Sequence, residues 1–88
     1  MLDLLIANGL VIDGTGNPAY RAAVGVEGDT LRVLRGDVSS VEAARTIDAS
    51  DCVVCPGFID MHAHSGLVML SEPRHEPKVR QGITTELI

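Results

Sequence analysis

Pro56-Gly57-Phe58-Ile59-Asp60-Met61-His62-Ala63-His64 is the most informative segment of this chain. Pro-Gly marks a break, and the residues after it predict a strand whose polar side chains share one face. Within the crossover at 65–82, Pro77 is placed to begin a short helix and Gly82 to end it. Residues 83–88 are β-branched and predict a second strand. Strand, helical crossover and strand form a βαβ unit, which implies a parallel sheet.

Residues 1–55 have the pattern of β structure throughout. A first strand is expected at 2–7 and a returning one at 10–13, because Asn8-Gly9 tolerates the positive φ of a two-residue hairpin. Alternation from Ala22 to Val26, followed by a turn, predicts a second hairpin. Further short strands are expected at 46–48 and 52–55, with one helical turn or a loop at 39–45. Several short strands at this spacing predict a small sheet or half of a sandwich.

The length of 88 residues gives room for one small domain. A βαβ unit exposes both faces of its strands and cannot bury them with one short helix. The first 55 residues cannot cover that unit without giving up their own sheet. We therefore expect the N-terminal piece of a larger enzyme, with the remainder of the same polypeptide as its partner. The alternative is a complete small α+β domain, which would be monomeric and would melt cooperatively in urea.

The charge balance excludes two classes of partner. Seven Lys and Arg against twelve Asp and Glu give a net charge of −5. A chain with this acidic balance does not attract nucleic acid or an anionic membrane, which are themselves negatively charged. Tyr20 and Phe58 are the only aromatic residues, which excludes a base-stacking surface. No apolar run approaches the ~20 residues of a membrane span. Asp3 stands where a signal peptide would carry a basic residue, so we expect a cytoplasmic protein.

Two further motifs are interpreted as structural. Cys52 and Cys55 are too few for a disulfide framework and, three apart on a strand, point to opposite faces, so we expect buried, inert thiols. The run from Gly14 to Ala19 matches the dinucleotide fingerprint G-x-G-x-x-A, with Asp37 about twenty residues on. That fingerprint requires a helix at this point, whereas the following residues alternate as a strand. We therefore interpret the run as a turn.

His62 and His64 are the candidate metal ligands. Residues two apart on a strand share a face and lie ~6–7 Å apart, so two imidazoles can converge on one cation. The pair closes a strand that opens a βαβ unit, and open α/β sheets and (β/α)₈ barrels place their sites at C-terminal strand ends. Asp60, on the same face, is a candidate to orient one imidazole. The alternative is two histidines at the surface or core edge without a ligand.

The pair does not complete a catalytic zinc site, which usually takes three protein ligands and an open position. His75 is the remaining histidine, and in its polar, Pro-flanked setting we expect it to be exposed rather than a ligand. A solvated helix face is predicted for the charges at Arg74, Glu76, Lys78 and Arg80. The other metal ligands and the general base are therefore expected beyond residue 88.

Residues 56–64 resemble the P-G-x-I-D-x-H-x-H segment of the amidohydrolase superfamily at all six specified positions. Residues 3–9 and 11–16 resemble the opening of that family's small β-domain. A narrower resemblance, to the N-acyl-D-amino-acid deacylase (D-aminoacylase) branch, is carried by Leu70 with Pro73, Pro77-Lys78-Val79, Gln81-Gly82 and Thr84-Thr85. One position departs from the branch: Gly66 stands where many of its deacylases have an acidic residue.

The resemblance implies an α/β architecture in two parts. Residues 1–55 would be an incomplete small β-sandwich domain, completed by strands from the far C-terminus. Residues 56–88 would be the first βαβ unit of a (β/α)₈ metal-dependent hydrolase barrel, truncated here. The resemblance carries His62 and His64 over as ligands of one or two divalent ions, expected to be zinc, and carries over no general base.

The activity that the resemblance implies is metal-dependent hydrolysis of a non-peptide C–N bond in a small molecule, here an N-acyl-D-amino acid. A cyclic amide hydrolase of the dihydroorotase or hydantoinase type would keep the fold and change the substrate. A non-catalytic β-rich interaction domain, with the histidine pair incidental, is the third hypothesis. Metal analysis separates this last class from the other two, and the 88 residues alone are expected to be inactive.

Overall fold

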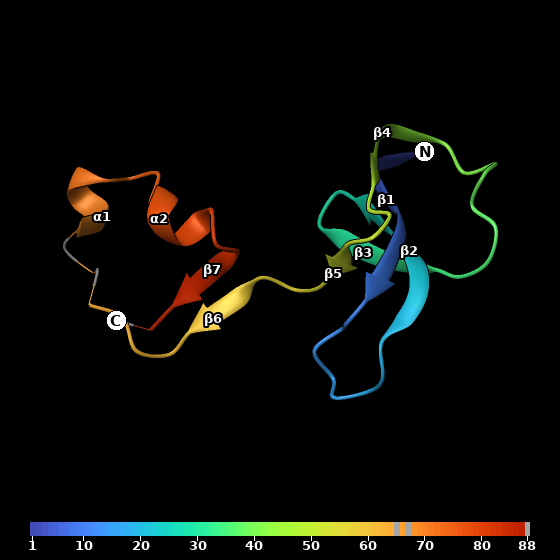
Figure 1. The fold of residues 1–88 in the computed structure, drawn as a ribbon. Helices are drawn as coiled ribbons and strands as arrows, with labels where there is room; N and C mark the ends of the chain where they lie inside the picture. Colours follow the sequence, from blue (N-terminus) through green and yellow to red (C-terminus); the bar gives the residue numbers. More distant parts are fainter. Residues whose placement is uncertain (65, 67, 88) are drawn as a thin grey trace. The chain divides into compact units, whose positions relative to one another are not determined.

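The computed structural model describes residues 1–64, 66 and 68–87, and the expectations for residues 65, 67 and 88 lie outside them. The chain divides into two compact units, Met1–Pro56 and Gly57–Ile88, and each is described by itself (Figure 1). In the described part of the chain, no helix is long and apolar enough to cross a membrane.

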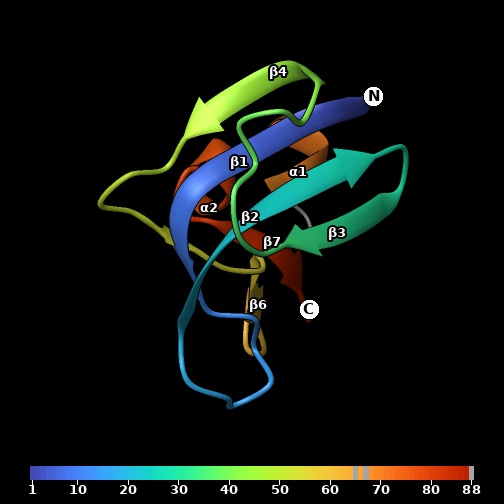
Figure 2. The same cartoon turned by 90° about the vertical axis from the view of Figure 1, so that its right-hand side faces the viewer.

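The first unit is a mixed sheet built on a long central strand (Figure 2). The strand order is β3-β2-β1-β4, with antiparallel pairing from β1 to β2 and from β2 to β3. On its other side β1 pairs in parallel, first with β4 and further along with β5. The strands are β1 (Leu2–Val11), β2 (Tyr20–Glu27), β3 (Thr30–Leu34), β4 (Ala43–Asp48) and β5 (Val53–Val54).

The hairpin predicted at Asn8-Gly9 is wrong, because β1 continues through both residues. Asn8 does adopt a positive φ of 68°, but it forms a bulge, across which the register with β2 shifts between Ile6 and Gly9. The second half of the strand stays in the sheet because Leu10 and Val11 pair with β2 on one side and with β5 on the other. The same conformational tolerance serves a turn and a bulge, so the dipeptide alone does not distinguish them.

The core of this unit lies on one face of the sheet. Buried residues Leu2, Leu5, Ala7 and Ala23 form it, and the segment after β3 folds over them. The partly buried residues packed against this core are Leu34, Val38, Val41 and Ala43. The helical turn or loop expected at 39–45 is only partly right. These residues contain no helix, and the last of them already belong to β4, which begins at Ala43.

The opposite face of the same sheet is apolar and largely uncovered. In register, Leu31 lies across from Val26, and Val33 from Val24. Leu31 and Val33 are 69% and 49% exposed, and Ile47, across from Ile6 on β4, is 42% exposed. A second sheet packed on this face would make a sandwich, which stays a prediction for the rest of the protein.

Both cysteines are exposed, so the prediction of buried thiols is wrong. The physical reason is the shortness of β5, which contains only Val53 and Val54. The flanking cysteines therefore lie outside the strand, although the Cys52 carbonyl still accepts a hydrogen bond of 3.1 Å from the Leu10 N–H of β1. The run from Gly14 to Ala19 is a loop that leads into strand β2, as the alternation predicts.

The second unit is a βαβ unit, which confirms the predicted α/β class (Figure 1). Strands β6 (Phe58–Asp60) and β7 (Ile83–Glu86) pair in parallel, with helices α1 (Val68–Ser71) and α2 (Glu76–Val79) between them. Pro77 lies in the first turn of α2, where its missing N–H costs nothing. Gly82, with a φ of 86°, ends the crossover before β7. Whether this unit opens a (β/α)₈ barrel, and whether the first unit is a sandwich domain, stay predictions.

Candidate metal centre

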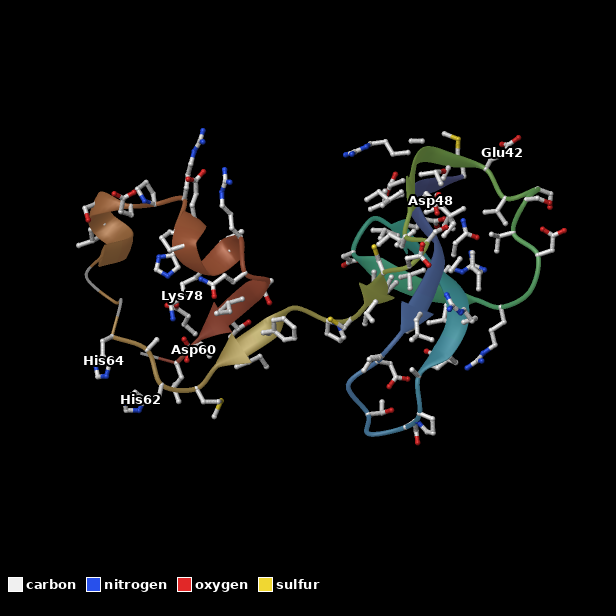
Figure 3. The ribbon with its side chains drawn as sticks, in the orientation of Figure 1. Glu42, Asp48, Asp60, His62, His64 and Lys78 are labelled. Carbon is white, nitrogen blue, oxygen red and sulfur yellow. The ribbon has the colours of Figure 1, made fainter. Side chains whose placement is uncertain are left out.

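The histidine pair lies just past the C-terminal end of β6 (Figure 3). The predicted strand through residue 64 is wrong, because β6 ends at Asp60 and the chain bends at Met61 and His62. The bend is closed by the Asp60 carboxylate, whose Oδ1 accepts a hydrogen bond of 3.1 Å from the His62 backbone N–H. The loop stays attached to the end of β7, since the Ala63 N–H donates to the Leu87 carbonyl.

The two imidazoles nevertheless converge. The Nε2 atoms of His62 and His64 lie 2.9 Å apart, and their rings meet edge to face with centroids 4.8 Å apart. Both side chains are exposed and point the same way out of the loop (Figure 3). At this distance the two ring nitrogens cannot point lone pairs at each other. Either one nitrogen carries an N–H that donates to the other, or a cation lies between them.

The spacing of the pair fits a shared transition-metal ion. Two nitrogens at ~2.05 Å from one metal lie ~3.3 Å apart at a tetrahedral angle and ~2.9 Å apart at a right angle. The observed 2.9 Å equals the right-angle value and is ~0.4 Å shorter than the tetrahedral one. Neutral imidazole is also the nitrogen donor that zinc prefers. The residues present therefore fit two ligands of such an ion.

No cluster of three or more His, Cys, Asp or Glu side chains that could hold a metal occurs in residues 1–64, 66 and 68–87. His75 is not the exposed residue that the sequence predicts. Its side chain is 19% exposed, and its Nε2 lies 3.1 Å from the Glu86 carboxylate. The described residues therefore provide two candidate ligands, in keeping with further ligands elsewhere in the protein.

Asp60 contacts the backbone of the loop. One carboxylate oxygen accepts a hydrogen bond from the His62 backbone N–H, and the other accepts one of 2.5 Å from the Lys78 ammonium. The hydrogen bond from Lys78, followed by the one from the His62 amide, holds the pKa of the Asp60 carboxyl below its ordinary value. Asp60 thus stays ionised and fixes the turn that begins the loop with His62 and His64.

Lys78 is a functional candidate that the sequence interpretation missed. The sequence predicts a solvated helix face for it, yet its ammonium lies between Asp60 and Glu86, at 2.5 and 3.6 Å. The bond to Asp60 raises the pKa of Lys78. The rest of that face fits the prediction, since Arg74 and Arg80 are 87% and 78% exposed beside Glu76. The missed signal is the strand register. It places the Asp60 and Glu86 carboxylates side by side, and a cation between them lowers their repulsion.

Comparisons with known proteins agree with the motif. No protein-family model matches the chain. It is 45% identical over 87 residues to N-acyl-D-glutamate deacylase of Alcaligenes xylosoxydans xylosoxydans, covering 99% of this chain and 18% of that protein. It is also 45% identical over 83 residues to the D-aminoacylase of the same organism, covering 94% of this chain and 17% of the relative.

Solved structures show the same backbone. N-acyl-D-glutamate deacylase from Bordetella bronchiseptica, in complex with zinc and a phosphonate inhibitor, superposes with a TM-score of 0.89 at 40% identity. That match covers 99% of this chain and 18% of the solved one. Over nearly its whole length the chain is therefore similar to N-acyl-D-amino-acid deacylases, including a solved D-aminoacylase that belongs to a subset of the amidohydrolases. The chain spans 17 to 18% of the length of the two Alcaligenes deacylases compared above.

Cyclic amide hydrolases are more distant matches to this chain. The dihydroorotase of Aquifex aeolicus is 39% identical over 64 residues, covering 73% of this chain and 15% of that protein. The L-hydantoinase of Arthrobacter aurescens has a TM-score of 0.62 at 34% identity, covering 73% of this chain and 14% of the solved one. The deacylases match over nearly the whole chain, so they are the better guide to the branch.

Proposed function

We propose that this chain is part of a metal-dependent hydrolase that removes the acyl group from N-acyl-D-amino acids. The observation that carries the proposal is the convergence of His62 Nε2 and His64 Nε2 at 2.9 Å, just past the end of a strand in a βαβ unit. The deacylase relatives support it, because they are 45% identical to this chain over 94 to 99% of its length. Gly66, which departs from the branch pattern, leaves the amino acid of the substrate open.

The proposed cofactor is zinc, with one or two ions per protein. The Bordetella deacylase is complexed with zinc, and a solved D-aminoacylase has a binuclear metal centre. When bound, zinc supplies a Lewis acid for the amide carbonyl and makes water a nucleophile near neutral pH. His62 and His64 would hold it through neutral Nε2 atoms, and Asp60 would fix the loop through the His62 amide. The proton-transfer group is proposed to lie outside this chain.

The remaining parts of the proposal concern the whole protein. We propose that β6 and β7 are the first two strands of a (β/α)₈ barrel, because metal sites in such barrels lie at the C-terminal strand ends. We propose a small-molecule substrate and a cytoplasmic location. A zinc enzyme found in the membrane or secreted fraction of its host would contradict the location.

The histidine pair can be tested in the whole protein by the double change His62→Ala and His64→Ala. We expect the loss of bound zinc and a fall in amide hydrolysis greater than the ~100-fold typical of a lost outer partner. The measurements are metal content by mass spectrometry and release of the free D-amino acid. His75→Ala is the matched control, because it removes an imidazole that contacts Glu86, and it should keep its zinc. Unchanged zinc content in the double variant would refute the proposed site.

The second candidate is a cyclic amide hydrolase, favoured by the dihydroorotase and hydantoinase matches. The two activities are separated by substrate. Purified protein would be assayed with N-acetyl-D-glutamate and N-acetyl-D-aspartate, and in parallel with dihydroorotate and hydantoin. Turnover of the acyl amino acids alone supports the deacylase, and turnover of the ring substrates alone assigns the second activity.

A further inference from the structure

The turn at Asp60, which leads into the proposed metal-binding loop with His62 and His64, differs from three similar turns in this chain. In all four turns an aspartate carboxylate accepts a hydrogen bond from the backbone N–H of the residue two positions after it. The four aspartates are Asp13, Asp37, Asp48 and Asp60. In the first three the donating residue is Thr or Ser, whose hydroxyl also interacts with the carboxylate. After Asp60 that residue is His62, whose ring faces His64 instead. The second donor to Asp60 comes from Lys78, in helix α2.

The strand register explains why a cation is needed there. Asp60 and Glu86 are direct partners across the parallel strands β6 and β7, so two carboxylates end side by side. Like charges directly opposite in a sheet repel. The Lys78 Nζ lies 2.5 Å from Asp60 Oδ2 and 3.6 Å from Glu86 Oε1, and so relieves the repulsion. The Lys78 side chain is 31% exposed and that of Glu86 is 10% exposed, which limits screening by water.

We propose that Lys78 is a positioning residue for the metal-binding loop: it holds Asp60, and Asp60 fixes the His62 backbone so that the two imidazoles meet. The inference rests on the proposed metal site. Lys78 contacts neither imidazole, so its effect reaches the metal through the Asp60 carboxylate and the turn that this carboxylate closes. Figure 3 shows the order in space, with Lys78 and Asp60 adjacent and the two histidines beyond them.

The test is Lys78→Met in the whole protein, with Arg80→Met as the matched control. Both changes remove a cation from the crossover after β6, but Arg80 contacts only Glu76 among the ion pairs described. We expect Lys78→Met to weaken zinc binding 10- to 100-fold in chelator competition, the range typical of a lost outer partner, and Arg80→Met to leave it unchanged. In the metal-free protein, Lys78→Met should also speed hydrogen exchange at the His62 amide.

Two further variants separate positioning from general stability. Lys78→Arg, which keeps a cation that can donate to Asp60, should restore most of the zinc affinity. In an Asp60→Asn background, Lys78→Met should weaken zinc binding much less than it does alone, because both changes break one connection. Should Lys78→Met fail to fold, Lys78→Gln is measured in its place, with the same expected loss of affinity and faster exchange at His62.

Wild-type zinc affinity and wild-type His62 exchange in folded Lys78→Met or Lys78→Gln would overturn the inference. That result leaves the proposed function standing if the double histidine variant still loses its metal. If the double histidine variant keeps its metal, the proposed function fails first. The cobalt(II)-substituted protein gives a second readout, since an altered ligand geometry in Lys78→Met changes the visible absorption spectrum whereas Arg80→Met should not.

Discussion

Aspartate carboxylates close four of the described turns in one way, by accepting a backbone N–H from two residues on at 2.9–3.1 Å. Hydrogen bonds to the charged form favour ionisation, and the pKa of each carboxyl lies below its ordinary value. The main donors are the Thr15 side chain to Asp13, the Ser39 amide to Asp37, the Ser50 side chain to Asp48 and the Lys78 side chain to Asp60. Each of these turns therefore depends on an ionised aspartate.

Asp48 gives a test of this dependence on pH. Its carboxylate accepts bonds from the Ser50 hydroxyl at 2.6 Å and the Asn8 amide at 3.0 Å, which lower its pKa from the ordinary 3.8. The stability that it contributes is therefore fully present above pH 3.8 and is lost as the pH falls through the lower, folded-state pKa. Asp48→Asn should lower the urea midpoint at neutral pH and flatten its decline in acid.

The control for this experiment is Asp51→Asn, which removes the same charge from the same turn. Both variants are unfolded in urea at a series of pH values from neutral to below 3.8. The difference between their midpoints isolates the hydrogen bonds to Asp48 from the change in net charge. Identical pH profiles for the two variants would mean that these bonds contribute nothing to the pH dependence.

The bulge at Asn8 decides whether β1 is one strand or two, and it can be tested by substitution. Most residues with a Cβ pay about 1 kcal/mol to adopt the left-handed φ that Asn8 holds at 68°, whereas Asn adopts it more readily and Gly adopts it without this penalty. Asn8→Ala should therefore lower the free energy of unfolding by about 1 kcal/mol, and Asn8→Gly by clearly less. Both lose the bond to Asp48 equally. Equal losses in urea unfolding would contradict a strained bulge.

The elements that could be predicted from the sequence are those whose signals are local. Pro77 and Gly82 mark the helical crossover because each fixes a backbone conformation by itself. Asn8 also fixes a local conformation, but pairing with β2 and with the more distant β5 decides between turn and bulge. The role of Lys78 is invisible for the same reason, since its partners belong to two strands whose register is a tertiary property. The histidine convergence needs only two-residue spacing, and it survives the early end of β6.

The two units differ in how much apolar surface they bury by themselves. The buried hydrophobic residues in the described part of the chain all lie in Met1–Pro56, and they are Leu2, Leu5, Ala7, Val11, Ala23 and Ala49. In the second unit even the strand residues Phe58 and Ile59 are 56% and 62% exposed. Hydrophobic burial is the main term that offsets chain entropy. The βαβ unit therefore depends on structure outside the described residues far more than the sheet does.

Hydrogen exchange on the isolated 88-residue chain would measure this difference directly. Backbone amides exchange through local opening, whose free energy follows the buried apolar contacts around them. We expect the β1 and β2 amides to be protected most strongly and the β6 and β7 amides to exchange at nearly unfolded rates. In the whole protein both sets should be protected, because neighbouring strands and helices would then cover Phe58 and Ile59. Strong protection of β6 and β7 in the isolated chain would show that the βαβ unit is stable without a larger barrel.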